Sequence, residues 1–462
     1  MVCAIWFRRD LRVEDNRAVY RALENGERPF CVFVIDPKVL SASASPIRSS
    51  YLKASLEELN EELDDNLTVL LGDTPSELAR FVSQNGISDL YSSRDVTPLS
   101  RKMQRQVAEA LSKVGVRLHL VDTPYLVPPE QVLKEDGSPF RVFTPYFRSW
   151  IRSALVEKVV RLPRRYEFRS SKPDVRNEWG PLEQVVSYRG QFPTSSAEIA
   201  ARLDYFADEI LPDYSELRDF PAKDGTSRLS VALKFGRIHP RTIFERVVDF
   251  DPGLRFISEL CWRDFFGAIL YHNPQSPNVS LDVRYDSMRW DVGPRAESRL
   301  EAWKKGRTGY PLVDAGMREL LETGYMHNRV RMVVGSFLVK DLHIDWRLGA
   351  RYFMDKLLDG DVASNIGGWQ WVAGCGSDAA PFFRVFNPTL QLQKFDPQGH
   401  YIRRYLPELG DSDVGNWAGM SLADSILDED GRRYPLQIVD HDVERKEALR
   451  RLRELSSDGF AS

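Results

Sequence analysis

The sequence predicts an α/β domain with a doubly wound parallel sheet, then a long connector and an all-helical domain. In the first 125 residues, short apolar runs alternate with helical stretches, which is typical of a parallel sheet with right-handed crossovers. After residue 196 the strand patterns mostly vanish and helical periodicity dominates. Sequence rich in proline and aromatic residues lies between them. We therefore expect domains at 1–125 and 196–462, joined by a connector at 126–195.

Five apolar runs in the first part predict strands, and three stretches between them predict helices. The predicted strands are 2–7, 30–35, 67–71, 89–91 and 118–121, and the helices are 49–62, 76–82 and 101–111. Sheets of this kind bind ligands at the carboxyl ends of their strands. Because no Gly-x-Gly-x-x-Gly follows the first run, a dinucleotide held in the Rossmann manner is not expected there.

The last part of the chain contains eight helical windows and no internal repeat. The windows are 196–210, 242–248, 254–271, 296–303, 314–323, 328–342, 346–358 and 443–455. Most of the ten tryptophans also lie after residue 255. This clustering needs a reason beyond the packing of helices.

The charge balance and the hydropathy of the chain exclude several classes of protein. With 63 basic and 67 acidic residues the net charge is −4, so a polyanion must be met by a local basic surface. No apolar run approaches the roughly 18 residues that span a bilayer. The first residues become charged too early for a secretory signal. We expect a cytoplasmic protein, associated with the nucleoid if it is prokaryotic, without a membrane partner.

The four cysteines, Cys3, Cys31, Cys261 and Cys375, form no close pair. This spacing excludes zinc-ribbon and thioredoxin-like motifs and suits a reducing compartment, with the thiols as small packing residues.

Four clusters of polar and aromatic residues can carry chemistry, and three of them also have a plain structural explanation. At 225–230, hydroxyls and backbone amides open a helix, which suits a phosphate, although an ordinary N-cap explains one or two of them. At 259–266, Glu259 and Arg263 share a helix face beside Trp262, as a surface ion pair and a core tryptophan also would. The other clusters are 324–332 and 359–371. The last has too few oxygens for a hard cation, so we expect no metal site, and solvated carboxylates are its alternative.

Together with segments 6–12, 308–315 and 386–388, these clusters resemble the DNA photolyase and cryptochrome family. The resemblance runs in order from the first residues to about Leu409 and is greatest to class I-type photolyases of cyclobutane pyrimidine dimers. It implies an α/β antenna domain and a helical domain that holds FAD in a U-shaped conformation, reduced and anionic in the active state. The implied FAD-binding residues are Tyr214, Thr226, Ser227, Arg228, Leu229, Ser230, Arg263, Asn328, Arg331, Asp359, Gly360, Asp361 and Asn365.

Within that set, the resemblance places Asn365 opposite flavin N5. A neutral amide there can hydrogen-bond to a protonated N5 without adding negative charge, whereas aspartate would favour a signalling cryptochrome of the plant type. We also expect Arg331 and Asp359 to form an ion pair, because buried charges need partners.

The resemblance implies a cavity for a flipped pyrimidine dimer in DNA, where aromatic faces stack on the bases and polar groups bond to their edges. Its expected walls are Glu259, Trp262, Asn328, Met332 and Trp371, with Arg218, Arg263, Arg329 and Gln391 at the rim. Glu259 and Asn365 are the expected catalytic residues, together with an electron relay through Trp369, Trp346 and Trp290. The stretch from Trp290 to Trp303 is longer than the family pattern, so the outermost member can also be a core tryptophan.

Sequence details separate the subclasses. The segment Met326-His327-Asn328-Arg329 lacks the adjacent histidines of six-four photolyases, which favours cyclobutane dimers. Phe33, Asp36, Arg48 and Asp95 resemble the antenna site of deazaflavin-binding photolyases, so 8-hydroxy-5-deazaflavin is favoured over methenyltetrahydrofolate. Their alternative is ordinary strand-end and loop residues. The expected protein is a monomeric, light-driven carbon–carbon lyase acting on UV-damaged DNA. The alternative is a blue-light photosensor of the cryptochrome kind, without repair activity.

Overall fold

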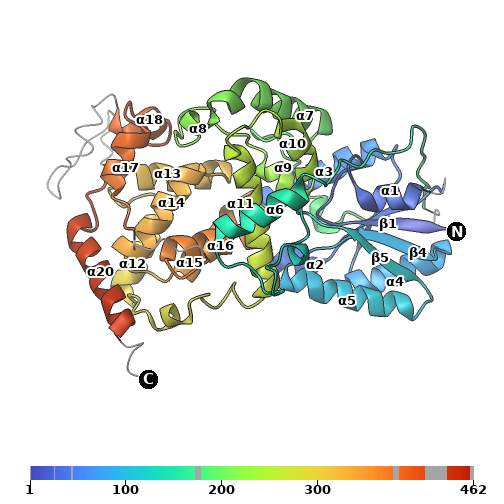
Figure 1. Ribbon diagram of the computed structural model, residues 1–462, viewed down its shortest axis with the longest axis horizontal. Coiled ribbons are helices and arrows are strands. Elements are labelled where there is room, and N and C mark those ends of the chain that lie inside the picture. Colours follow the sequence, from blue (N-terminus) through green and yellow to red (C-terminus); the bar gives the residue numbers. More distant parts are fainter. Residues whose placement is uncertain are drawn as a thin grey trace. The chain divides into compact units, whose positions relative to one another are not determined.

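The computed structural model describes residues 2–24, 27–42, 45–171, 178–377, 384–410 and 434–457. The chain divides into two compact units. Unit 1 comprises Met1–Pro212 and Ser227–Pro274, and unit 2 comprises Asp213–Thr226 and Gln275–Ser462. Figure 1 labels the elements of both. None of the helices in the described ranges combines the length and the apolar character that a bilayer span requires.

Unit 1 is built on a five-stranded parallel sheet with the strand order β3-β2-β1-β4-β5. The strands are β1 (Cys3–Phe7), β2 (Phe30–Ile35), β3 (Leu67–Leu71), β4 (Asp89–Ser93) and β5 (Arg117–Asp122). In the register of the sheet, Ala4 of β1 lies opposite Phe30 of β2 on one side and opposite Leu90 of β4 on the other. β1 and β2 are buried along their whole length, as expected for strands covered on both faces.

Helices cover both faces of this sheet. α1 (Arg17–Leu23) and α3 (Pro46–Glu62) pack with Ile5 and Phe7 on one face. α4 (Thr74–Asn85) and α5 (Pro98–Ser112) pack with Ala4 and Trp6 on the other. The alternation of inward residues along β1 follows from the two-residue period of a strand. This confirms the doubly wound layer, and the short α2 (Pro37–Ala42) follows β2.

Unit 1 also contains helices from later in the sequence. They are α6 (Phe143–Ala154), α7 (Ser196–Tyr205), α9 (Ser230–Phe235), α10 (Pro240–Val247) and α11 (Arg255–His272). Short 3-10 and π-helical segments, η1 (Pro129–Gln131), η2 (Gly180–Leu182), η3 (Phe206–Ile210) and η4 (Leu211–Asp213), lie along this part of the chain. The contacts thus assign 227–274 to the unit of the sheet, whereas the predicted boundaries at 125 and 195 divide the chain by secondary structure and stay a prediction.

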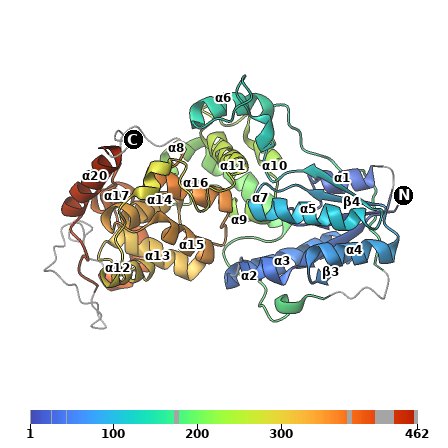
Figure 2. The ribbon, with the colours of Figure 1, turned by 90° about the horizontal axis from the view of Figure 1, so that it is seen from below.

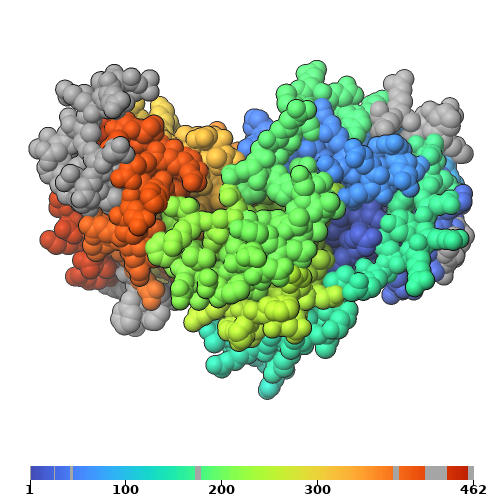
Figure 3. Space-filling view, turned by 90° about the horizontal axis from the view of Figure 1, so that it is seen from above, coloured from blue at the N-terminus to red at the C-terminus, as the bar shows by residue number. Residues whose placement is uncertain are grey.

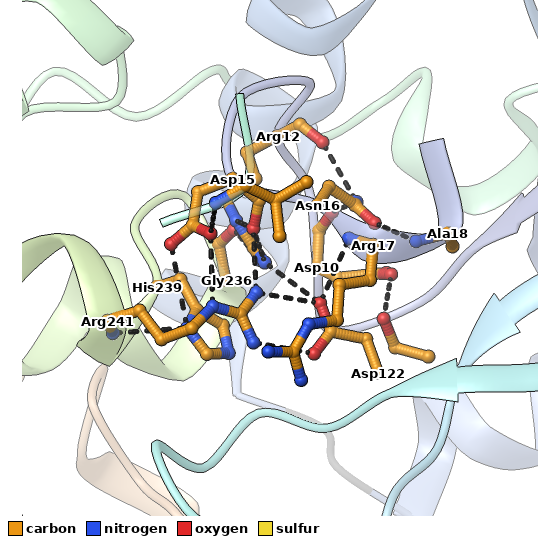
Figure 4. Close-up of polar contacts among 12 residues, drawn as sticks. Asp10, Arg12, Asp15, Asn16, Arg17, Ala18, Asp122, Gly236, His239 and Arg241 are labelled. Atoms are coloured by element: carbon orange, nitrogen blue, oxygen red, sulfur yellow. Dashed lines mark hydrogen bonds and ion pairs between the residues drawn. The ribbon is translucent and has the colours of Figure 1, made fainter. Parts of the chain in front are cut away.

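A buried charged network joins α10 to the sheet (Figure 4). Arg241 donates from Nε to Asp15 at 3.0 Å, and from Nη1 and Nη2 to the two carboxylate oxygens of Asp122 at 2.9 and 3.0 Å. His239 bonds through Nε2 to the carbonyl of Thr123 at 2.8 Å. Burial alone would raise the pKa of Asp122, but the charge of His239 and the hydrogen bonds and charge of Arg241 hold that pKa well below its usual range.

Unit 2 is helical. Its helices are α8 (Tyr214–Leu217), α12 (Pro294–Lys304), α13 (Pro311–Thr323), α14 (Asn328–Ser336), α15 (Trp346–Lys356), α16 (Val362–Ala373), α17 (Pro388–Phe395), α18 (His400–Tyr405) and α20 (His441–Ser457). The segments η5 (Val283–Ser287), η6 (Phe337–Asp341) and η7 (Pro407–Leu409) supplement them. One core runs through the unit, and Trp303 and Trp346 are fully buried in it. The predicted helical domain is therefore confirmed.

Among the helices that were not predicted are α6, inside the connector, and α16. Both contain aromatic residues in place of a clean apolar stripe, and α16 also contains Gly367 and Gly368. The four cysteines are free and buried, as expected for packing residues.

Candidate functional site

α16 orients Asn365 in unit 2. The helix is capped by Asp361, whose carboxylate accepts the N–H of Ser364 at 3.0 Å. Asn365, 9% exposed, lies one turn further on and donates its side-chain amide to the carbonyl of Ala350 at 2.9 Å. Its side-chain oxygen accepts no hydrogen bond from a described residue. The oriented amide therefore keeps a free acceptor.

The turn before α16 holds the ion pair expected from the sequence. Arg331 donates from Nη2 to both carboxylate oxygens of Asp359, at 2.8 and 3.1 Å. Nε of Arg331 donates to the carbonyl of Met326 at 2.6 Å, so the guanidinium is held at two places. Burial would lower the pKa of Arg331, but the charge of Asp359 outweighs it and raises the pKa. Gly360 is the link between Asp359 and the capping residue of α16.

α14 places further predicted residues on the same unit. His327 caps the helix by accepting the N–H of Arg329, so Asn328 stands in the first turn and is exposed. Met332 follows four residues later on the same face and is half-buried. The guanidinium of Arg329, by contrast, forms an ion pair with the carboxylate of Asp219, with nitrogen and oxygen 2.8 Å apart.

Four tryptophans bear on the predicted relay. Trp369, 4% exposed, lies one turn beyond Asn365 on α16. Trp346 is fully buried at the start of α15, and Trp290 is half-buried against the core of unit 2. Trp369 contacts the rings of Phe353 and Trp303, with centroids 5.0 and 6.2 Å away. Sequence analysis used Trp303 only to measure spacing and missed this contact, which no local pattern encodes.

Other predicted residues of unit 2 are spread over short elements. Tyr214 is buried in α8 beneath the guanidinium of Arg218, 5.3 Å from its ring centroid. Gln391 of α17 has a side-chain oxygen that is buried without a donor among the described residues. Thr226 and Trp371 are half-buried.

In unit 1, α11 carries Glu259, Trp262 and Arg263. The first two are half-buried, and the indole of Trp262 stacks on Phe143 of α6 with centroids 3.8 Å apart and planes 3° apart. Arg263 donates to the carbonyl of Pro124 at 2.5 Å. The next residue, Asp264, is fully buried, and burial raises its pKa to about 6.

The 227–230 segment of unit 1 does not form an ordinary cap. α9 begins at Ser230 with Leu229 at the N-cap, which makes no side-chain cap bond, while the hydroxyl of Ser227 accepts the N–H of Leu229 at 3.4 Å. Arg228 has a left-handed backbone with φ of 56° and donates to Gln191 at 2.6 Å. The carbonyl of Ser227 accepts Nε of Arg202 at 3.0 Å.

A largely apolar cavity of about 200 Å³ opens beside the carboxyl ends of β1 and β2 in unit 1. Phe33 and Asp36 line it, as does Trp6, with Arg8 over its ring at 4.7 Å. Asp95 instead lines a small adjoining cavity, and Arg48 lines neither. Sequence analysis thus found two lining residues and missed Trp6, Leu52, Leu99 and Met103.

The residues of unit 2 fit a flavin. The free acceptor of Asn365 matches an N–H donor such as N5 of a reduced isoalloxazine. The Arg331–Asp359 pair offers further polar contact at the start of the same helix. A parallel-sheet unit with an apolar cavity and a helical unit with this donor and acceptor set define a two-unit flavoprotein.

Comparisons with known proteins give the family. Residues 3–164 match the family model described as DNA photolyase, and residues 256–454 match the FAD binding domain of DNA photolyase. The deoxyribodipyrimidine photo-lyase of Alkalihalophilus pseudofirmus is 36% identical, covering 96% of each chain.

Comparison with solved structures points to the same family. The class III photolyase of Agrobacterium tumefaciens has a TM-score of 0.87 at 33% identity, covering 99% of this chain and 98% of its own. The cryptochrome of Synechocystis has a TM-score of 0.87 at 29% identity, covering 97% and 98%. The chain belongs to the DNA photolyase family, and FAD is its cofactor.

Proposed function

We propose that this chain is a light-driven repair enzyme that splits cyclobutane pyrimidine dimers in UV-damaged DNA. The observation that carries the proposal is Asn365, a neutral amide held by Ala350 with its acceptor oxygen free, one turn before Trp369. The relative from Alkalihalophilus pseudofirmus, similar over 96% of both chains, bears the name of this activity. Class I within the family stays a prediction.

The side chains divide the work between binding and tuning. When bound, FAD supplies the light absorption and the one-electron chemistry. Asn365 accepts a hydrogen bond and adds no charge, which keeps an anionic reduced cofactor tolerable. In unit 1, Trp262 offers an aromatic face for the fused bases, and Glu259 offers hydrogen bonds to their edges.

The direct test uses protein that has been reduced before the assay. Mixed with UV-treated oligothymidine and illuminated with blue light, it should restore the ultraviolet absorbance of the thymines, and a dark sample should not. A Glu259→Gln variant should keep its FAD content and repair with lower quantum yield, because the carboxylate is lost and the size is kept. Recovery of thymine absorbance in the dark sample would contradict a light-driven reaction.

The alternative function is photosensing, which the likeness to the Synechocystis cryptochrome favours. A photosensor would photoreduce its flavin and leave the dimers intact. Illumination of two samples separates the two functions: flavin absorbance follows photoreduction in a sample that starts oxidised, and thymine absorbance follows repair in the sample that starts reduced.

We further propose 8-hydroxy-5-deazaflavin as the antenna pigment, held in the cavity lined by Trp6, Phe33 and Asp36. The apolar walls suit a planar ring system, and Asp36 offers a polar contact at one end. Pigment extracted from the purified protein should show the deazaflavin spectrum. A methenyltetrahydrofolate spectrum, or a second equivalent of flavin, would contradict this choice.

We also propose that the enzyme acts as a monomer in the compartment that holds the DNA. A molar mass of about twice 53.0 kDa by light scattering in solution would contradict the monomer.

A further inference from the structure

Two of the three arginines predicted at the substrate rim are already bound within the protein. Arg263 donates to the carbonyl of Pro124, and its side chain is 14% exposed. Arg329 pairs with Asp219, and its side chain is 18% exposed. Neither can neutralise a phosphate without giving up a protein contact. Since the net charge of the chain is −4, the basic surface for DNA must also involve other residues.

α6 and the residues around it supply unpaired positive charge in unit 1. Residues 137–156 contain Arg141, Arg148 and Arg152 and no aspartate or glutamate. All three arginines are exposed, and none makes a hydrogen bond or an ion pair with a described residue. Exposed arginines without a partner among the described residues are the electrostatic footprint that a polyanion needs.

The geometry of α6 directs these charges outward. Tyr146, Trp150 and Ala154 form the buried side of the helix. Arg148 and Arg152, four residues apart, share the opposite face, with their Cβ atoms roughly 6 Å apart. α6 stands at the outer edge of unit 1 in two opposite views (Figures 2 and 3). The guanidinium groups of Arg148 and Arg152 can thus contact the backbone of one DNA strand together.

The same helix contacts a predicted substrate residue. Phe143, at the start of α6, stacks face to face on Trp262 of α11, with centroids 3.8 Å apart. Phe265 contacts both rings edge-on, at 5.8 and 5.6 Å. This aromatic cluster fixes α6 beside the indole that we expect to stack on the lesion.

We propose that α6 is a DNA-binding surface, on which Arg141, Arg148 and Arg152 bind the phosphates that flank a lesion held at Trp262. The inference rests on the proposed function, because it needs DNA as the substrate. Arginine suits this task, since its planar guanidinium binds phosphate oxygens in pairs. Such contacts position the duplex and do not read its sequence.

The test compares two full-length double variants that lose the same charge. Arg148→Ala/Arg152→Ala changes the α6 surface, and Lys102→Ala/Arg105→Ala removes two exposed cations from α5. Fluorescence anisotropy gives the affinity for a short duplex with one thymine dimer at rising salt. For the α6 variant, the slope of log K against log salt should fall in magnitude by about 2. The factor by which wild type binds the duplex more tightly than the α6 variant should shrink about tenfold between about 50 and 200 mM salt. The α5 variant should follow wild type.

A second substrate separates this inference from the proposed function. A thymine dimer dinucleotide has no flanking phosphates, so the α6 variant and wild type should repair it with equal kcat/KM. Arg148→Lys/Arg152→Lys, which keeps the charge, should keep the salt slope. Equal slopes for wild type and the alanine variant on the duplex would overturn the α6 surface. Failure of wild type to repair both the duplex and the dinucleotide would overturn the proposed function instead.

Discussion

Trp369 is the residue through which electrons should reach the flavin. It is 4% exposed, belongs to the core of unit 2 and lies one turn from Asn365, the predicted flavin contact. In Trp369→Phe, photoreduction of oxidised protein should fall at least tenfold, because phenylalanine is much harder to oxidise. Repair by protein that is already reduced should be unchanged. Flavin absorbance under blue light with an external thiol measures the first activity, and thymine absorbance measures the second.

The matched control for this prediction is Trp303→Phe. Trp303 contacts the ring of Trp369 at 6.2 Å and donates Nε1 to the carbonyl of Val334, which is the contact set of a core residue. We expect this variant to keep most of the photoreduction. Equal loss of photoreduction and repair in Trp369→Phe would show that the indole supports the flavin site structurally and does not relay electrons.

Arg241 shows how a single buried charge can hold an element in place. It is 1% exposed and satisfies Asp15 and Asp122 together, so Arg241→Met would leave two carboxylates buried without their main partner. Such a loss costs about 3–5 kcal/mol of unfolding free energy. Arg246→Met on the same helix breaks only pairs with Asp204 and Asp208, both 61% exposed, and should cost below about 1 kcal/mol. Urea denaturation of both variants measures the difference, and equal midpoints would contradict it.

The packing of α15 on α16 depends on a glycine. A Cβ at Gly349 would lie 2.2 Å from the ring of Trp369 and 2.6 Å from Leu338. Gly349→Ala should therefore destabilise unit 2 by about 1–3 kcal/mol, although alanine favours a helix. It should also slow photoreduction, because the indole must move. Thermal unfolding and flavin absorbance under light measure the two effects.

Gly368→Ala is the control, since a Cβ at that helical position meets no atom within 4 Å. It should gain up to about 1 kcal/mol from helix propensity. A stability loss in Gly368→Ala as large as that in Gly349→Ala would contradict the packing argument.

At the scale of elements, the sequence predicted those with a clean period and missed those without one. The five strands and α11 follow plain apolar patterns, so their existence could be read directly. α6 was missed because its buried side, Tyr146, Trp150 and Ala154, lies within a proline-rich stretch that reads as a connector, and α16 because Gly367 and Gly368 are poor helix formers. Tertiary packing decides both helices, and a local pattern does not contain it.

The site residues show the same limit. Asp359 and Arg331 could be paired in advance because a buried charge needs a partner, and the ion pair is present. The stacking of Phe143 on Trp262 could not, because it joins residues 119 positions apart through the docking of two helices. The hydrogen bond from Arg263 to the backbone carbonyl of Pro124 could not be predicted either.

At the scale of the whole molecule, the chain returns to unit 1 after beginning unit 2. Residues 227–274 belong with the sheet, and the network of Arg241, Asp15 and Asp122 joins α10 to it. A reading of secondary structure along the chain cannot see this return, because helices from both units look alike in sequence. Residues 227–274, which return to unit 1, include α11 and therefore Glu259 and Trp262.

The stability of the molecule should depend on pH through a buried carboxyl group in each unit. Burial raises the pKa of Asp264 in unit 1, and of Asp341 in unit 2, from 3.8 to about 6. A folded-state pKa above the unfolded one means that the folded protein binds the proton more tightly. Each group therefore destabilises the fold when ionised, and this cost is relieved as pH falls from 7 through 6 toward 4.

Asp264→Asn isolates this contribution. The amide oxygen can still accept the N–H groups of Val127 and Trp150, each 2.9 Å from the carboxylate, and it carries no charge at any pH. The variant should exceed wild type by on the order of 2–3 kcal/mol in unfolding free energy at pH 7, from about two pKa units. The advantage should be largely gone by pH 4, where Asp264 of wild type is protonated. Denaturation across this pH range measures it, and the exposed Asp249→Asn should show no such trend. An advantage that does not change with pH would mean that the substitution acts through packing and not through the charge of the carboxylate.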